Sequence, residues 1–278
     1  MNYVELHCHS NFSFLDGASH PEDLARRAAE LGYPALALTD HNGLYGIVRF
    51  SQAAKEHGVR PIFGAEISLT NGHHLILLAR NSAGYANLSQ LLSAAQLENP
   101  KGNAKVTREQ LESHRNGLIA LSGCVQGEIP ALLIKNEVDQ ARDSARQMLD
   151  LFGKDSFYLE LQHHNLPRHE LLCQKLARLG RQTGIPLVAT NNVHFALAEQ
   201  RRIQDVLTCI KNHVTLDDAK ELLYPNGERY LKSPQQMAKL FASYPEAVEN
   251  SLAIASRCDF ALTGLKTSLD FFHVKCVV

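Results

Sequence analysis

Long apolar runs are missing from this 278-residue sequence, although 45% of its residues are hydrophobic. No run approaches the roughly 20 residues that a membrane-spanning helix needs. The first residues, Met1 to Glu5, also lack the basic and then apolar layout of a signal peptide. We therefore expect a cytoplasmic protein with no membrane partner, long enough for one large domain or two modest ones with a sizeable core.

Closely spaced cysteines and an excess of basic charge are absent as well. The six cysteines lie far apart along the chain, so we expect no disulfides and a ligand role for any special cysteine. Lys and Arg number 28 against 29 Asp and Glu, which gives a net charge of -1. Such a balance produces no global basic field for nucleic acid. If DNA is a partner, we expect other parts of a longer protein to hold it.

Short apolar runs alternate with amphipathic segments along most of the sequence. We interpret the runs as buried parallel strands: Tyr3 to Leu6, Ala35 to Thr39, Pro61 to Phe63, Leu75 to Ala79, Leu118 to Leu121, Phe157 to Leu161 and Leu187 to Thr190. Helices are indicated between them, with capping-box spacing at Ser19 to Glu22 and at Thr107 to Gln110. This alternation predicts a parallel α/β fold, either a barrel or a doubly wound open sheet.

The pattern changes to helices alone after about Glu199. Ser233-Pro234 and Tyr244-Pro245 are typical helix starts. We therefore predict one domain over residues 1–262, with a barrel core over about 1–198 and a helical C-terminal appendage over about 199–262. Residues 263–278 lack a convincing pattern and are interpreted as a tail.

Candidate metal ligands follow the predicted strands at their carboxyl ends. They stand in His7-Cys8-His9, Thr39-Asp40-His41, Gly64-Ala65-Glu66, Ser122-Gly123-Cys124 and Asn191-Asn192-Val193-His194. In a closed barrel these ends converge on one face, where active sites lie. Alternation along a strand also places His7 and His9 on the same side, where they can share one ion.

Each of these groups has an ordinary structural alternative. A histidine at a strand end is usually hydrogen-bonded, Asp40 could cap the next helix, Glu66 could form a buried ion pair, and Cys124 could be a small core residue. Their joint placement on one predicted face favours a shared site. Imidazoles, carboxylates and one thiolate suit zinc, manganese or iron better than magnesium or calcium, and several such ions indicate hydrolysis of a phosphate ester.

These motifs together resemble a known family. Leu6 to Ser10, Phe14 to Gly17, Leu38 to His41, Phe63 to Glu66, His74 to Asn81, Ser122 to Cys124 and Ala189 to His194 are similar, in order, to the motifs of the PHP (polymerase and histidinol phosphatase) domain. Together with Arg229 to Pro234, they resemble the PHP domain that opens bacterial C-family DNA polymerases, most of all the error-prone DnaE-like (ImuC) type. The resemblance covers about residues 3 to 260 and implies a distorted barrel of seven strand-helix units.

The resemblance implies a ligand set for up to three divalent metal ions, of zinc, manganese or iron. The set comprises His7, His9, Asp16, His41, Glu66, His74, Cys124 and His194. Asp16 and His74 come from the resemblance alone. Asp40 is expected to orient His41. Position 192 departs from the family, since active members carry aspartate where this chain has Asn192, a neutral and poorer ligand.

The resemblance also implies partners. Polymerases of this family hold catalytic magnesium with palm-domain aspartates, and this chain contains no Asp-x-Asp. We expect the palm and thumb of a longer polymerase chain, DNA bound through that chain, and other translesion-synthesis proteins as partners. Three functions stay open: a polymerase PHP domain with a weakened, mainly structural site; an active 3′–5′ exonuclease or pyrophosphatase; and a free-standing PHP phosphatase, which the helical segment argues against.

Overall fold

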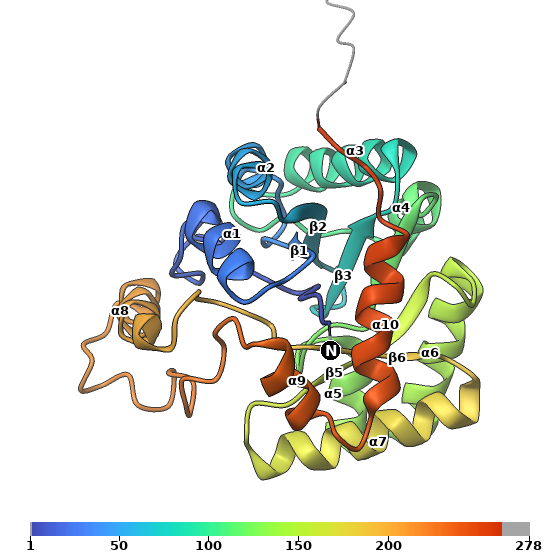
Figure 1. Cartoon of the computed structure of the whole chain (residues 1–278). Helices are drawn as coiled ribbons and strands as arrows, with labels where there is room; N and C mark the ends of the chain where they lie inside the picture. The colour runs from blue at the N-terminus through green and yellow to red at the C-terminus, as the bar shows by residue number, and fades with distance from the viewer. Residues whose placement is uncertain (1, 263–278) are drawn as a thin grey trace, which may run out of the picture.

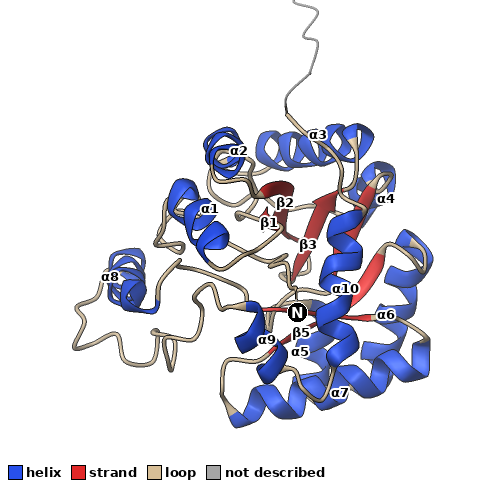
Figure 2. Ribbon diagram, viewed as in Figure 1, coloured by secondary structure: helices blue, strands red, loops and turns tan. Residues whose placement is uncertain are grey.

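A computed structural model describes residues 2–262 of the chain and shows an α/β fold built on one curled sheet (Figures 1 and 2). The sheet has six strands in the order β1-β2-β3-β4-β5-β6, the same as their order in the chain. Their bounds are β1 Ala35–Leu38, β2 Arg60–Ser68, β3 His74–Ala79, β4 Leu118–Leu121, β5 Phe157–Gln162 and β6 Leu187–Thr190.

Helices connect the strands and surround the sheet in Figure 2. Before β6 these are α1 Pro21–Glu30, α2 Ile47–Glu56, α3 Ser82–Glu98, α4 Arg108–His114, α5 Glu128–Ile134, α6 Val138–Phe152 and α7 Pro167–Thr183. After β6 come the 3-10 turn η1 Ala198–Gln200, α8 Arg201–Asn212, α9 Pro234–Leu240 and α10 Pro245–Ser256. In the described residues, no helix is both long and apolar enough to cross a membrane.

The prediction of seven strands is not matched by the sheet. The first apolar run, Tyr3 to Leu6, forms isolated bridges in place of a regular strand, with Glu5 bridged to Leu36. In the continuation of this run, the His9 amide donates to the Val193 carbonyl at 2.8 Å, just after the end of β6. The N-terminal segment therefore lies between β1 and the chain after β6, but it bonds too intermittently to count as a strand.

The prediction of an all-parallel sheet is wrong at β3. This strand pairs antiparallel with both β2 and β4, whereas β1-β2, β4-β5 and β5-β6 are parallel. Only residues 69–73 separate β2 from β3, and a parallel connection needs a dozen or more residues. The reversal places the first residue of β3, His74, at the edge where the neighbouring strands end.

Side chains on the two faces of the sheet form two separate apolar clusters. Residues such as Phe63, Leu77 and Leu159 face outward and pack with the surrounding helices. The alternate residues, including Ile62 and Ile76, face inward and form a second cluster.

Helix α10 completes the inner cluster and runs across the front of the sheet in Figure 1. Its Ile254 and Ala255, with Cys258 just beyond it, pack among the inward side chains of the strands. The segment expected as a helical appendage therefore supplies part of the core.

Candidate metal centre

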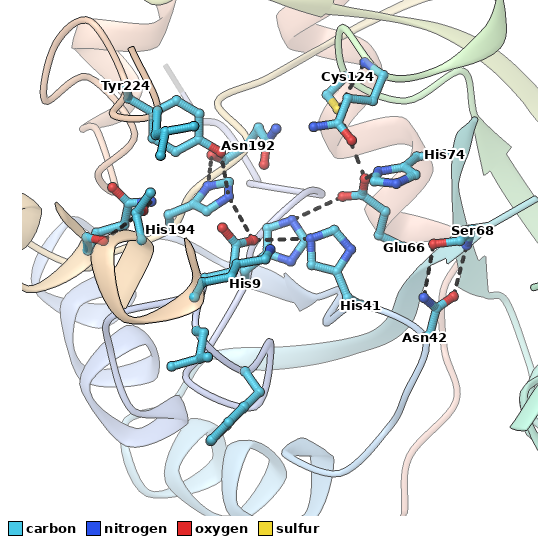
Figure 3. Close-up of a pocket in the computed structure, with 18 of the residues that line it drawn as sticks. His9, His41, Asn42, Glu66, Ser68, His74, Cys124, Asn192, His194 and Tyr224 are labelled. Carbon is cyan, nitrogen blue, oxygen red and sulfur yellow. Dashed lines mark hydrogen bonds and ion pairs between the residues drawn. The ribbon is translucent and has the colours of Figure 1, made fainter. Parts of the chain in front are cut away.

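A cavity of about 540 Å³ opens at the edge of the sheet where β2 and β4 to β6 end. It is lined by eight of the nine expected ligand positions: His9, Asp16, His41, Glu66, His74, Cys124, Asn192 and His194 (Figure 3). The ninth, His7, is fully buried, and its Nε2 lies 2.7 Å from Oε2 of Glu66. The fold thus brings together residues that are spread from position 7 to position 194.

Strand periodicity explains how the core gives way to the cavity. Ile62 and Glu66 are four residues apart on β2, so both side chains lie on the same face of that strand. Ile62 packs in the inner apolar cluster, whereas Glu66 reaches the cavity. Glu66 lies within β2, not beyond it as predicted, because this strand runs on to Ser68. His74, which pairs with Ser68, enters the cavity from the neighbouring strand.

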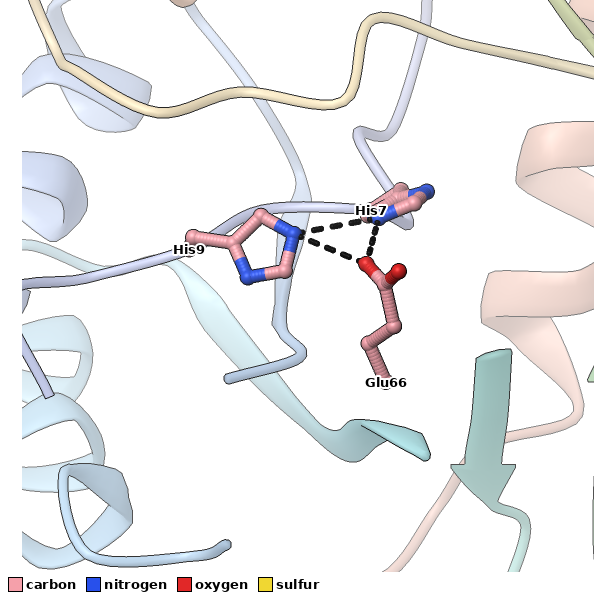
Figure 4. A group of neighbouring side chains, drawn as sticks. All are labelled: His7, His9 and Glu66. Carbon is pink, nitrogen blue, oxygen red and sulfur yellow. Dashed lines mark hydrogen bonds and ion pairs between the residues drawn. The ribbon is translucent and has the colours of Figure 1, made fainter. Parts of the chain in front are cut away.

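Three overlapping sets of side chains each place three possible ligand atoms within 4.8 Å of one another. They are His7-His9-Glu66, His9-Asp16-His41 and His41-Glu66-His74. Figure 4 shows the first set, with both imidazoles directed at the Glu66 carboxylate. His9, Glu66 and His41 each belong to two sets, so neighbouring ions would share ligands. Cys124 and His194 belong to none of them.

The protonation of His9 follows from its partner Ser13. The single Ser13 hydroxyl proton goes to Oδ1 of Asp40 at 2.6 Å, so Ser13 accepts from Nδ1 of His9 at 3.1 Å. Burial, then the charge of His41, lowers the pKa of His9 to about 3, which keeps the ring neutral. Its Nε2 therefore carries a lone pair, directed into the centre.

Asp40 is linked through Ser13 to two of the histidines. Its carboxylate accepts from the Ser10 amide and hydroxyl, both at 2.7 Å, and from Ser13. Ser13 in turn accepts from the ring of His9 and, at 3.1 Å, from the His41 amide, and the expected orientation of the His41 ring by Asp40 stays a prediction. The turn after His9 places these two serines against Asp40.

Glu160 was missed in the sequence and forms the second contact of His7. Its Oε1 lies 2.7 Å from Nδ1 of His7, and Gln162 donates to the same oxygen at 2.7 Å. Burial would lower the pKa of His7, but Glu160 and Glu66 raise it to about 10. An acidic residue at an alternate position within an otherwise apolar strand was the available signal.

Asp16, His41 and His194 form the other side of the cavity. Oδ2 of Asp16 lies 3.1 Å from Nε2 of His41 and 3.2 Å from Nε2 of His194. Burial opposes ionisation of Asp16, yet His194 above all holds its pKa well below the usual range. Tyr224, also missed in the sequence, places its hydroxyl 3.3 Å from Nε2 of His194.

Cys124 and Asn192 lie at the edge of the cluster. The Cys124 thiol is 4.0 Å from Oε1 of Glu66, and burial, followed by the charge of Glu66, raises its pKa. Oδ1 of Asn192 is buried and has no hydrogen-bond partner among the described residues, while its amide nitrogen lies 3.5 Å from Gln162 Oε1.

The donor set fits divalent cations. The unprotonated Nε2 of His9 lies 3.1 Å from an oxygen of Glu66. Burial raises the pKa of the Glu66 carboxyl, but His41 and His7 outweigh it and hold that pKa well below its usual range. A lone pair facing a carboxylate is repulsive unless a cation lies between them. Mixed imidazole and carboxylate ligands suit zinc, manganese or iron.

Sequence comparisons identify related proteins. The PHP domain model matches residues 5–164. The error-prone DNA polymerase of Symbiobacterium thermophilum is 43% identical over 274 residues, covering 93% of this chain and 25% of that protein. DNA polymerase III subunit alpha of Treponema pallidum is 40% identical over 288 residues, covering 99% of this chain and 25% of that protein. The chain thus spans about a quarter of the length of these relatives.

Solved structures share lower similarity. An amidohydrolase from Chromobacterium violaceum with bound sulfate aligns with a TM-score of 0.46 at 18% identity, over 69% of this chain and 87% of that one. A lesion-specific endonuclease from Pyrococcus furiosus aligns with a TM-score of 0.45 at 12% identity, over 69% of this chain and 48% of that one.

Proposed function

Because the chain belongs to the PHP-domain family, we propose that it is the PHP domain of an error-prone bacterial DNA polymerase, with a divalent metal centre whose role is mainly structural. The observation that carries the metal centre is the overlap of its three ligand sets on His9, Glu66 and His41. A divalent cation at this overlap would be bound by imidazole nitrogens and by the Glu66 carboxylate together. In this proposal the N-terminal segment occupies the place of the seventh strand of a PHP-type barrel, between β1 and the chain after β6.

The ligands in the proposal are His7, His9, Asp16, His41, Glu66, His74, Cys124 and His194, for up to three ions of zinc, manganese or iron. Divalent ions in this cavity would polarise phosphate oxygens and activate water. Asp40, acting through Ser13, holds the His9 ring so that Nε2 points inward. Glu160 does the same for His7 by accepting from Nδ1.

We assign the weakened activity to Asn192. Its neutral carbonyl oxygen is a poorer ligand than the aspartate of active relatives of the family. Low hydrolytic activity would leave the ions a structural role, because they join side chains from the N-terminal segment, β2 and β3.

Metal analysis of the purified 278-residue chain, paired with a 3′–5′ exonuclease assay in matched manganese and zinc, tests the proposal. We expect at least one bound ion per chain and little or no hydrolysis. A metal-free protein after dialysis against either ion would refute the metal centre. Robust hydrolysis that His9→Ala abolishes would refute the structural role.

An active phosphoesterase, either an exonuclease or a pyrophosphatase, is the second candidate function. It is favoured by the accessibility of the centre: the His41 side chain is 29% exposed and Asp16 is 16% exposed at the cavity. A free-standing phosphatase is less supported, because the match to the polymerases extends over 93% and 99% of the chain, through its helical region.

The remaining partners are proposed from the relatives. They are the palm and thumb of a longer polymerase chain, DNA bound through that chain, and other translesion-synthesis proteins. A cytoplasmic location accompanies this function.

A further inference from the structure

A second cavity of about 370 Å³ lies beside the metal centre, at the start of α7. Tyr224 lines both cavities, and its hydroxyl contacts His194 of the metal centre. One wall of the second cavity is apolar and consists of Val125, Ile134, Leu166, Leu172 and Pro225. Its volume falls in the range of small-molecule sites.

The charges of the second cavity are all positive. Arg168 and Arg229 line it, and none of the described residues in its lining is acidic. Arg229 is only 7% exposed, lies 4.0 Å above the ring of Tyr224, and forms no ion pair with a carboxylate in residues 2–262. Its Nη1 donates to the Asn192 carbonyl at 3.5 Å, and a guanidinium that has no carboxylate partner is suited to an external anion.

Two histidines in this cavity have defined tautomers. The backbone amide of His164 donates to Nδ1 of His169 at 3.2 Å, so the Nε2 of His169 carries the proton. Burial, then Arg229, lowers the pKa of His169 to about 4, and the ring is a neutral donor.

His164 lines the same cavity with an enclosed ring. Its Nε2 donates to the Asn191 carbonyl at 2.8 Å, which leaves Nδ1 with a lone pair. That Nδ1 is buried and has no hydrogen-bond partner among the described residues, and His164 as a whole is 2% exposed. This enclosed nitrogen is not available to a ligand, so His164 serves as part of the wall of the cavity.

We infer that the second cavity binds a nucleoside monophosphate. The phosphate lies against Arg168, Arg229 and the N–H of His169. The base packs on the apolar wall. A simple anion would leave the apolar wall unused.

This inference goes beyond the proposed function, because it requires no metal. The test is therefore calorimetric titration of the 278-residue chain with dAMP in the presence of EDTA, with deoxyadenosine and inorganic phosphate as separate ligands. We expect a dissociation constant on the order of 0.1 mM for dAMP, and binding about tenfold weaker or more for each of the two fragments.

Three variants locate the binding. Arg168→Gln, at an exposed position, is expected to weaken dAMP about tenfold. Ile134→Trp, at a position 52% exposed, is expected to block the apolar wall without a change of charge. Arg178→Gln is the matched control, since it removes the same charge from an exposed position on α7 outside the cavity, and it should leave the affinity within about twofold.

Absence of dAMP binding overturns the inference. Equal losses in Arg168→Gln and Arg178→Gln, or phosphate binding as tight as dAMP, would also overturn it. Loss of metal binding in the separate metal analysis would leave the inference intact, so the two proposals fail independently.

Discussion

Ser13 connects a buried carboxylate to the ring of His9, and this single hydroxyl fixes which nitrogen faces the metal centre. In Ser13→Ala the His9 ring loses the acceptor for its Nδ1 proton, and Asp40 loses one donor. We expect metal affinity to fall by about 10-fold to 100-fold, measured by competition with a chelator. Ser113→Ala is the control, since that exposed hydroxyl donates to the Glu109 carbonyl within α4. Equal affinities in the two variants would contradict the role of Ser13.

Asn192 is the position where an added charge has the clearest effect. Its backbone has a φ of 44°, a conformation that both asparagine and aspartate tolerate, and its Oδ1 is buried without a partner. We expect Asn192→Asp to increase the metal content per chain and to raise phosphoesterase activity. Metal stoichiometry and hydrolysis rate in matched manganese and zinc measure this.

Asn165→Asp is the control for the same change, because Asn165 also has a positive φ, 54°, and is exposed. A gain in both variants would show a general charge effect. No gain in either would show that Asn192 is not at a metal position.

The residues that sequence reasoning missed are those whose role depends on contacts between distant segments. Strand-end motifs named part of the cavity lining, because periodicity and chain order place such residues at one edge of the sheet. Asp16 and His74, which also line the cavity, were named by the family resemblance alone. Glu160 was hidden inside a strand interpreted as apolar, and Tyr224 lies in a segment without regular structure. Their contacts with His7 and His194 depend on the folded chain.

At the scale of elements, local signals predicted best where no distant group competed for them. The capping box at Thr107 and Gln110 is confirmed, and α9 and α10 begin at the predicted prolines. The box predicted at Ser19 is wrong. His20 is the N-cap of α1, while the Ser19 hydroxyl donates to Gln200 at 2.8 Å, a residue far along the chain. The antiparallel pairing of β3 was also missed, because an apolar run does not indicate in which direction its strand pairs with its neighbours.

Helix α10 is predicted to be essential for folding, because its Ile254 is fully buried among the inward side chains of the sheet. Ile254→Ala should lower the free energy of unfolding by about 2–5 kcal/mol, measured by urea denaturation. Ile203→Ala makes the same change at a position of α8 that is 49% exposed and should cost about 1 kcal/mol or less. Similar losses at the two positions would mean that α10 is a separable appendage.

At the scale of the whole molecule, charge limits what this chain does with DNA. Affinity for DNA depends on phosphate neutralisation by Lys and Arg, and the net charge here is -1. We expect weak DNA binding by fluorescence anisotropy and no primer extension by the 278-residue chain. Template-dependent synthesis on a gel would contradict this expectation.

The position of Glu66 also affects how fast the molecule unfolds once its ligand sets hold ions. Such ions would tie the N-terminal segment to β2 and β3 through the shared carboxylate, as a covalent cross-link does. Opening the sheet at this edge would then require an ion to dissociate first. The slower the ion dissociates, the higher the barrier to unfolding would be. Chelators would capture the released ion and so accelerate unfolding. Resistance to proteases would then depend on the rate at which the ion exchanges.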